Sequence, residues 1–213
     1  MEITWLGHSC FRLKGRDVTV VTDPYSPETG YTIGKPAANI VTVSHQHPGH
    51  NFASAVSGDP HVVDGPGEYE IAGVFITGIA AYHDKERGQR LGRNTVFLIE
   101  LDEITVCHLG DLGHVPSAEQ TESMNNIDVL LIPIGGGNSL DATSASETIS
   151  LLEPKIVIPM HYKTEAVKAE LEPVEKFLKE MGVKEAVQQP KLTVSKSSLP
   201  AQTTVVLLEP RRG

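Results

Sequence analysis

The feature that most constrains the fold of this chain is the position of its titratable residues relative to its short apolar segments. Runs rich in β-branched residues predict strands, and several of them are followed closely by a histidine or an aspartate. His45 follows the predicted strand 40–44, Asp111 follows 104–107 and His161 follows 156–158. An α/β scaffold assembles a site in this way, along the edge where its strands end. The sequence therefore predicts a layered α/β protein with one polar site at that edge.

The remaining elements fit this architecture. Strands are predicted at residues 3–6, 10–13, 18–22, 40–44, 62–63, 68–71, 74–77, 95–101, 104–107, 129–133, 156–158 and 203–208. Helices are predicted at 144–152, where Ser144 and Glu147 have the spacing of a capping box, at 173–181, and more weakly at 53–56. The predicted elements are strands in the first part of the chain and alternating strands and helices in the second. This order favours an architecture in which helices cover sheets. No linker or repeat divides the 213 residues, so we expect a single domain spanning 1–213 whose tail completes the second sheet.

Charge and hydropathy restrict the function. The formal net charge of −9 argues against nucleic-acid binding, which needs an excess of lysine and arginine. No segment approaches the roughly 20 apolar residues that span a bilayer, and the N-terminus has no signal-peptide pattern. We therefore expect a cytoplasmic protein that acts on a small molecule, with no nucleic-acid or membrane partner and with homo-oligomerisation left open. Cys10 and Cys107 are expected to be buried, reduced thiols.

The strongest local signal is the segment SHQHPGH at residues 44–50. Its three histidines, His45, His47 and His50, lie within six residues in a loop bent by proline and glycine, so their rings can turn toward one point. Neutral imidazole is the commonest protein ligand for zinc and similar metals. The alternative is a histidine-rich surface turn with no ligand role. Three histidines at this spacing favour the metal site.

Several segments together resemble the metallo-β-lactamase superfamily. They are WLGHSCF (5–11), TDP (22–24), SHQHPGH (44–50), LGD (109–111), IPIGG (132–136) and IPMHY (158–162). The most similar branch contains the ascorbate-6-phosphate lactonase-like proteins and other uncharacterised zinc-dependent hydrolases. The resemblance runs from about residue 2 to residue 162. It implies an α/β fold of the four-layer αββα sandwich type.

The resemblance also implies two adjacent metal positions. The first would use His45, His47 and His83, with Asp111 able to bridge; the second would use His50, Asp111, His161 and an aspartate where this chain has Gly49. Glycine has no side chain to donate, so we expect one well-bound ion and a weakened second position. Asp64 and Glu68 are the nearest candidate replacements, although a turn is the favoured role for both. Zinc is the expected metal, with manganese, iron or nickel as alternatives.

The function that follows is hydrolysis by a metal-activated water, in which the resemblance gives Asp111 and His50 the catalytic positions. The substrate would be a small anionic metabolite such as a lactone, an ester or a phosphate-bearing compound. The alternative is a degenerate member that binds a metal or a metabolite without turnover, because the missing aspartate at 49 can orient the attacking water in related hydrolases.

Other residues are expected to support the ligands or contact the substrate. These are Asp23, His8, Arg93 and Tyr162, with Arg87 and Arg90 as further cations and His108 and His114 as neighbours of Asp111. Asp23 would hold a ligand histidine. His8 would either line the pocket or serve only as a structural residue at a strand end, and Tyr162 would either contact an oxyanion or pack in the core. The basic stretch 85–93 is either a solvated loop or a rim of cations that attracts an anion.

Overall fold

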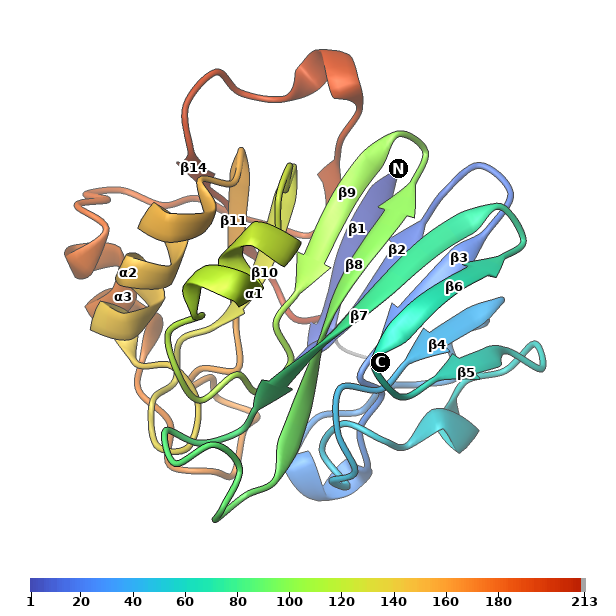
Figure 1. Ribbon diagram of the computed structural model, residues 1–213, viewed down its shortest axis with the longest axis horizontal. Coiled ribbons are helices and arrows are strands. Elements are labelled where there is room, and N and C mark those ends of the chain that lie inside the picture. The colour runs from blue at the N-terminus through green and yellow to red at the C-terminus, as the bar shows by residue number, and fades with distance from the viewer. Residues whose placement is uncertain (212–213) are drawn as a thin grey trace.

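The computed structural model describes residues 1–211 and contains two large sheets packed face to face (Figure 1). The first sheet has the order β13-β1-β2-β3-β4-β5. Its strands are β1 (Glu2–Gly7), β2 (Cys10–Lys14), β3 (Thr19–Thr22), β4 (Ile40–Thr42), β5 (His61–Val63) and β13 (Leu192–Thr193). β1, β3 and β4 run in the same direction, because β2 is antiparallel to both β1 and β3 and β4 is parallel to β3.

The second sheet has the order β14-β11-β10-β9-β8-β7-β6. Its strands are β6 (Gly67–Ile71), β7 (Val74–Tyr82), β8 (Arg93–Leu101), β9 (Ile104–His108), β10 (Val129–Pro133), β11 (Ile156–Met160) and β14 (Thr204–Val205). A small two-stranded sheet pairs β12 (Gln188–Gln189) with β15 (Leu207–Leu208). β7, β9, β10 and β11 run in one direction, so their carboxyl ends meet at one edge.

The three α-helices found within residues 1–211 lie beside β10 and β11 (Figure 1). They are α1 (Ala118–Ser123), α2 (Ala142–Leu152) and α3 (Val174–Glu180). All five residues of β10 and of β11 are buried, as expected for parallel strands that are covered on both faces. The outer face of the first sheet is covered mainly by irregular chain that carries the 3-10 turns Pro27–Thr29 and Ala53–Ala55.

Alternation along the central strands divides the core into two clusters. Val20 and Ile40 belong to the main cluster, which the second sheet shares. Val21 and Val41, the next residues along β3 and β4, pack in the second cluster with Tyr25 and other residues of the irregular segment. Full burial of one such aliphatic side chain contributes about 1.5–3 kcal/mol, so both faces of the first sheet are held by apolar packing.

The structure confirms the predicted α/β class with two packed sheets, and Cys10 and Cys107 are buried and free as expected. Two details of the prediction were wrong. Helix α2 begins at Ala142, because Asp141 is its N-cap and accepts a hydrogen bond from the Ser144 amide, so Ser144 does not begin a capping box. The predicted strand 203–208 is divided into β14 and β15, and only β14 joins the second sheet. Among the described residues, no helix is both long and apolar enough to cross a bilayer.

Candidate metal centre

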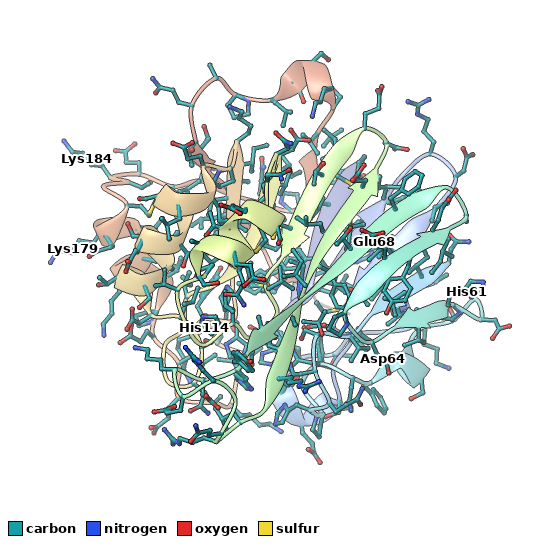
Figure 2. The ribbon with its side chains drawn as sticks, viewed as in Figure 1. His61, Asp64, Glu68, His114, Lys179 and Lys184 are labelled. Carbon is teal, nitrogen blue, oxygen red and sulfur yellow. The ribbon has the colours of Figure 1, made fainter. Side chains whose placement is uncertain are left out.

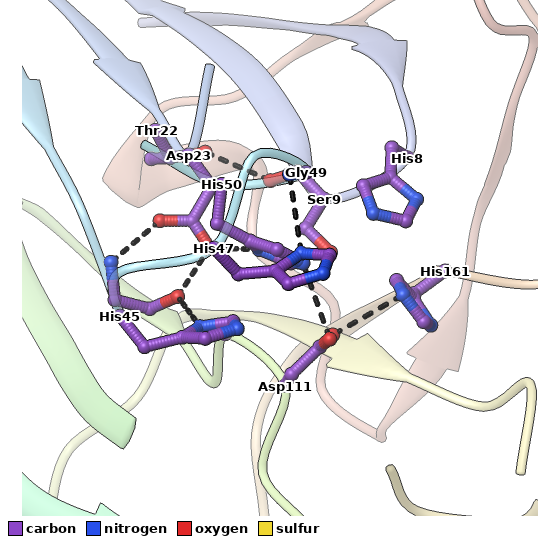
Figure 3. A network of polar contacts seen from close by, with 12 residues as sticks. His8, Ser9, Thr22, Asp23, His45, His47, Gly49, His50, Asp111 and His161 are labelled. Atoms are coloured by element: carbon purple, nitrogen blue, oxygen red, sulfur yellow. Dashed lines mark hydrogen bonds and ion pairs between the residues drawn. The ribbon is translucent and has the colours of Figure 1, made fainter. Parts of the chain in front are cut away.

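The histidines and aspartates expected at the sheet edge come together there (Figure 3). His45, His47 and His50 lie in the loop after β4, and Asp111 lies in the loop after β9. The other contributors come from the turn between β1 and β2 (His8), the end of β7 (His83) and the end of β11 (His161). Because β1, β4, β7, β9 and β11 all end at this edge, the topology concentrates the side chains of distant segments in one place.

Asp111 is the centre of the arrangement. Its carboxylate oxygens lie 3.1 Å from His50 Nε2, 3.3 Å from His83 Nε2 and 3.4 Å from His161 Nε2. The residue is 4 % exposed. A carboxylate that meets three imidazoles in a buried place is in the position from which it could bridge two cations.

Three groups of side chains place their donor atoms close enough to hold a metal ion. They are His45, His47 and His50; His45, His83 and Asp111; and His8, His50 and His161, with the donor atoms of each group within 4.8 Å of one another. His45 Nε2 is buried and has no hydrogen-bond partner among the described residues. A buried polar atom without a partner is costly, whereas the lone pair of a neutral imidazole is a good metal ligand. This donor set fits a zinc-type ion.

Asp23 anchors the histidine loop through hydrogen bonds to Ser44 and His50. It is fully buried after β3 and accepts hydrogen bonds from the Ser44 amide at 2.8 Å and from Ser44 Oγ at 2.5 Å. His50 Nδ1 lies 2.8 Å from the same carboxylate. A carboxylate on one ring nitrogen fixes the ring's orientation and leaves the other nitrogen for a metal. Asp23 therefore joins the histidine loop to the end of β3 through Ser44 and His50.

The electrostatics of the ion-free site follow from burial and from these two carboxylates. Burial disfavours the charged form of His50, but Asp111 and Asp23 outweigh it and raise the pKa of His50 to about 10. Burial lowers the pKa of His45 to about 3. Burial opposes ionisation of Asp111, but the adjacent His161 and His50 hold the pKa of Asp111 well below its usual range. Without a metal ion, the protonated imidazole of His50 is therefore the cation that lies between Asp23 and Asp111.

The free energy of unfolding of the ion-free protein is expected to fall as the pH rises from about 7.5 to about 8.5. The pKa of folded His50 is about 10, above its unfolded value of about 6.5, so the unfolded state releases a proton that the folded state keeps. The stability contributed by this proton is complete below pH 6.5 and is lost progressively up to about pH 10. The slope is at most about 1.4 kcal/mol per pH unit, so the loss from about pH 7.5 to about 8.5 is about 1 kcal/mol.

Urea unfolding of the chelator-treated protein at several pH values measures this slope. Above about pH 7.5 the histidines whose pKa is lowered by burial are neutral in the folded state and almost entirely neutral in the unfolded state, so they contribute little to the slope there. His50→Gln is expected to flatten the profile. A wild-type profile that is already flat or rises with pH would contradict the assignment of the proton to His50.

The loop that carries Asp111 depends on Asn94, which the sequence analysis missed. Asn94 at the start of β8 accepts a hydrogen bond from the Asp111 amide at 3.0 Å and donates to the Leu109 carbonyl at 2.9 Å. Gly110 has φ +59, and a Cβ there would lie 2.4 Å from Asn94 Oδ1, so only glycine fits. A single asparagine in the first residues of a strand belongs to no sequence motif, so its role is visible only in the folded chain.

The basic stretch forms a loop arranged around Asp84, a second residue that the sequence did not reveal. The Asp84 carboxylate accepts hydrogen bonds from four backbone amides, those of Glu86, Gly88, Arg90 and Leu91. Arg87, Arg90 and Arg93 are exposed, and none has an ion-pair partner in the described part of the chain. The loop begins directly after His83, and the His83 amide donates a hydrogen bond to the Gly92 carbonyl at 3.2 Å, so both ends of the loop lie beside that histidine.

Some expected residues are not brought to the centre. Tyr162 is 3 % exposed and packs against Trp5 with ring centroids 5.1 Å apart, so the packing alternative holds rather than contact with the site. Asp64 and Glu68 are exposed and belong to none of the candidate ligand groups, and His114 also lies apart from them (Figure 2). His108 is buried and its Nε2 lies 2.8 Å from the Ser9 carbonyl, where it supports the turn that carries His8.

Known proteins are similar to this chain over most of its length. Residues 2–161 match the model of the beta-lactamase superfamily domain. A metal-dependent hydrolase of Desulforamulus reducens is 30% identical over 196 residues, which cover 77% of this chain and 85% of the relative. A metal-dependent hydrolase of Thermoplasma acidophilum is 28% identical over 190 residues, with 77% and 84% covered. A solved structure from Thermotoga maritima, described as a Zn-dependent hydrolase of the metallo-beta-lactamase superfamily, is 40% identical and covers 97% of both chains with a TM-score of 0.81.

Proposed function

This chain belongs to the beta-lactamase superfamily and is a metal-dependent hydrolase of that family, and we propose that it cleaves a small anionic metabolite at the centre built around Asp111. The observation that carries the proposal is the convergence of three imidazoles on one buried carboxylate, beside further histidines that have donor atoms within reach. A structural ion-pair network has no need of so many histidines, most of which burial keeps neutral. Neutral imidazoles around a single carboxylate are the donor set of a metal-dependent enzyme.

Zinc is the metal we propose, held at the first position by His45, His47, His83 and Asp111. A bound ion of this type polarises the substrate oxygen and lowers the pKa of water to about 7. The chain's own residues supply the rest. Asp111 stays ionised at neutral pH and joins the two halves of the site, and His50 is held in one orientation by Asp23.

The proposed substrate class rests on the rim. Arg87, Arg90 and Arg93 lie exposed on the loop that follows His83, in a chain whose net charge is −9. A local group of cations on an acidic protein attracts an anion and can hold a carboxylate or phosphate group while a nearby carbonyl or phosphoryl centre is cleaved. An anionic lactone, an anionic ester or a phosphate-bearing metabolite would present both the anionic group and the carbonyl or phosphoryl centre.

The test is hydrolysis of a panel of lactones, aryl esters and phosphodiesters by the zinc-loaded protein, with His47→Ala as the variant. His47 is exposed, so its removal leaves the core unchanged. Loss of one ligand and of the ion it holds is expected to lower kcat/KM by on the order of 100-fold or more, about 3 kcal/mol. His61→Ala, which removes an exposed histidine of β5, is the matched control and is expected to keep full activity.

The outcomes separate the two candidate functions. Full activity in His47→Ala, with zinc still bound, would contradict the proposed centre. Stoichiometric zinc in the wild-type protein, with no hydrolysis of any compound in the panel, would favour a degenerate member that binds a metal or a metabolite without turnover. Gly49→Asp combined with His8→Ala then provides a further comparison, because the His8 ring lies where a side chain at position 49 would enter; a sharp gain in activity would show that the natural site is catalytically weakened.

A further inference from the structure

We propose that His8 is a metal ligand that occupies the place of the missing aspartate at position 49, so that the second metal position of this chain is complete. The inference rests on the proposed function, because it concerns the same metal centre. It also changes the expectation from the sequence, in which Gly49 left that position one ligand short.

The first observation is the space beside Gly49. A Cβ built on Gly49 would lie 2.9 Å from His8 Nε2 and 3.1 Å from His47 Nδ1. Separations this short are below ordinary van der Waals contact, so the His8 ring already fills the volume that a side chain at position 49 would enter. The φ of Gly49 is not in the left-handed region, and its backbone would accept another residue. A side chain at position 49 would therefore have to displace the His8 imidazole, and no backbone conformation requires glycine there.

The second observation is the set of neighbours around that ring. The His8 ring centroid lies 4.3 Å from that of His161 and 4.9 Å from that of His50. The donor atoms of these three histidines lie within 4.8 Å of one another, and Asp111 contacts both His50 and His161. Three imidazoles and one carboxylate are a full set for a four-coordinate ion.

The third observation is that Nδ1 of His8 is buried without a hydrogen-bond partner among the described residues. The residue is 6 % exposed, yet neither nitrogen makes a hydrogen bond to any described residue, and no dashed contact reaches its ring in Figure 3. Buried polar atoms almost always have a partner, and an imidazole kept for structure alone would be expected to have one. His108, buried nearby, shows the structural arrangement, because its Nε2 lies 2.8 Å from a backbone carbonyl.

The fourth observation is that the backbone holds His8 in an unfavourable conformation. Its φ is +53, which is uncommon for a residue with a side chain. The His8 carbonyl accepts hydrogen bonds from Trp5 Nε1 at 2.9 Å and from the His161 amide at 3.2 Å, so the turn is fixed from both sides. The bond from the His161 amide also ties two of the three proposed ligands to each other. Strain that the surroundings hold in place in this way is typical of functional positions.

The replacement of an aspartate by His8 changes the metal preference expected of the second position. With His8 in place of an aspartate, the second position has three neutral imidazoles and one carboxylate, and its donor set carries one negative charge fewer. Imidazole suits zinc, nickel and copper, whereas manganese prefers carboxylate. The second position is therefore expected to discriminate against manganese more strongly than a site that contains the usual aspartate.

The experiment compares metal content by elemental analysis after dialysis against excess zinc, in the wild-type protein and in the variants His8→Ala, His8→Ala with Gly49→Asp, and His114→Ala. We expect two ions per chain in the wild type and in His114→Ala, and one in His8→Ala, with the Kd of the second ion raised at least about 100-fold. The double variant is expected to regain the second ion, because removal of the His8 ring frees the space that an aspartate at 49 needs. X-ray absorption of the zinc-loaded proteins counts the imidazoles and is expected to show fewer per zinc in the double variant.

The other outcomes each overturn a defined claim. Two ions held with unchanged affinity in His8→Ala would overturn the role of His8, as would a single ion in the wild type. Failure of the double variant to regain the ion would overturn the equivalence of the two positions. No ion in any of the proteins would overturn the metal centre of the proposed function itself. Circular dichroism and thermal unfolding of His8→Ala without zinc show that the fold is retained, so that a lost ion is not mistaken for a lost fold.

Discussion

Replacement of Asp111 by asparagine is expected to lower kcat/KM for any substrate of this protein by on the order of 1,000-fold, about 4 kcal/mol. The change keeps the size of the side chain and removes its charge. Three histidines lie within 3.4 Å of the carboxylate, and the proposed ligand sets of both metal positions include it. An amide is a poor bridge between two cations, so the bound zinc is expected to fall below two ions per chain together with the activity.

The matched control for this variant is Asp59→Asn, the same chemical change at an exposed residue before β5. Asp59 has φ +53, which asparagine tolerates as well as aspartate does, so no change in activity or zinc content is expected. Steady-state kinetics and elemental analysis on the same preparations measure both effects. An Asp111→Asn protein that keeps two zinc ions and most of its activity would contradict a central role for this carboxylate.

The local part of the site could be predicted from the sequence because local spacing determines it. His45, His47 and His50 share one short loop, and the strands before Asp111 and His161 are continuous apolar runs that predict their own ends. The rule that parallel strands present their carboxyl ends at one edge then brings these residues together without any knowledge of side-chain contacts. The fold followed from the same apolar patterns, and most predicted strands differ from the observed ones by one or two residues.

The part that could not be predicted depends on volume and on contacts between distant segments. From the sequence, Gly49 indicated only a lost ligand, since nothing local shows that the ring of His8 fills the space beside it. Asn94 and Asp84 act through hydrogen bonds to backbone amides, which leave no pattern of residue types. Helix α1 was missed because its six residues show no apolar periodicity, although Ser117 and Gln120 form a capping box at its start.

The tail was also only partly predicted. We expected residues 203–208 to form one strand in the second sheet, but pairing divides between β14, which joins β11, and β15, which pairs with β12. Earlier in the tail, β13 pairs with β1 at the edge of the first sheet. Strands of two residues give almost no alternation to detect, so their partners are decided by the edges that the rest of the fold leaves open.

Removal of the Asp23 carboxylate is expected to destabilise the ion-free protein more than any other single change at the site. In Asp23→Ala, the Ser44 amide, Ser44 Oγ and His50 Nδ1 all lose a partner in a place that is fully buried. Breaking a buried charge pair and leaving its partners unsatisfied costs about 3–5 kcal/mol. Urea unfolding measures this loss, and Asp17→Ala, at an exposed aspartate, is expected to change the unfolding free energy by less than about 0.5 kcal/mol.

Asp23→Asn separates the support of His50 from the support of the fold. Its amide oxygen can still accept the hydrogen bond from the Ser44 backbone, so more of the stability is kept than in Asp23→Ala. The orientation of His50 is not kept, because the neutral amide no longer favours the ring state that leaves Nε2 open toward Asp111. We expect zinc affinity, measured by competition with a chromophoric chelator, to fall about 10- to 100-fold. Wild-type affinity in Asp23→Asn would show instead that the loop alone aims His50 and that Asp23 serves the fold and not the metal centre.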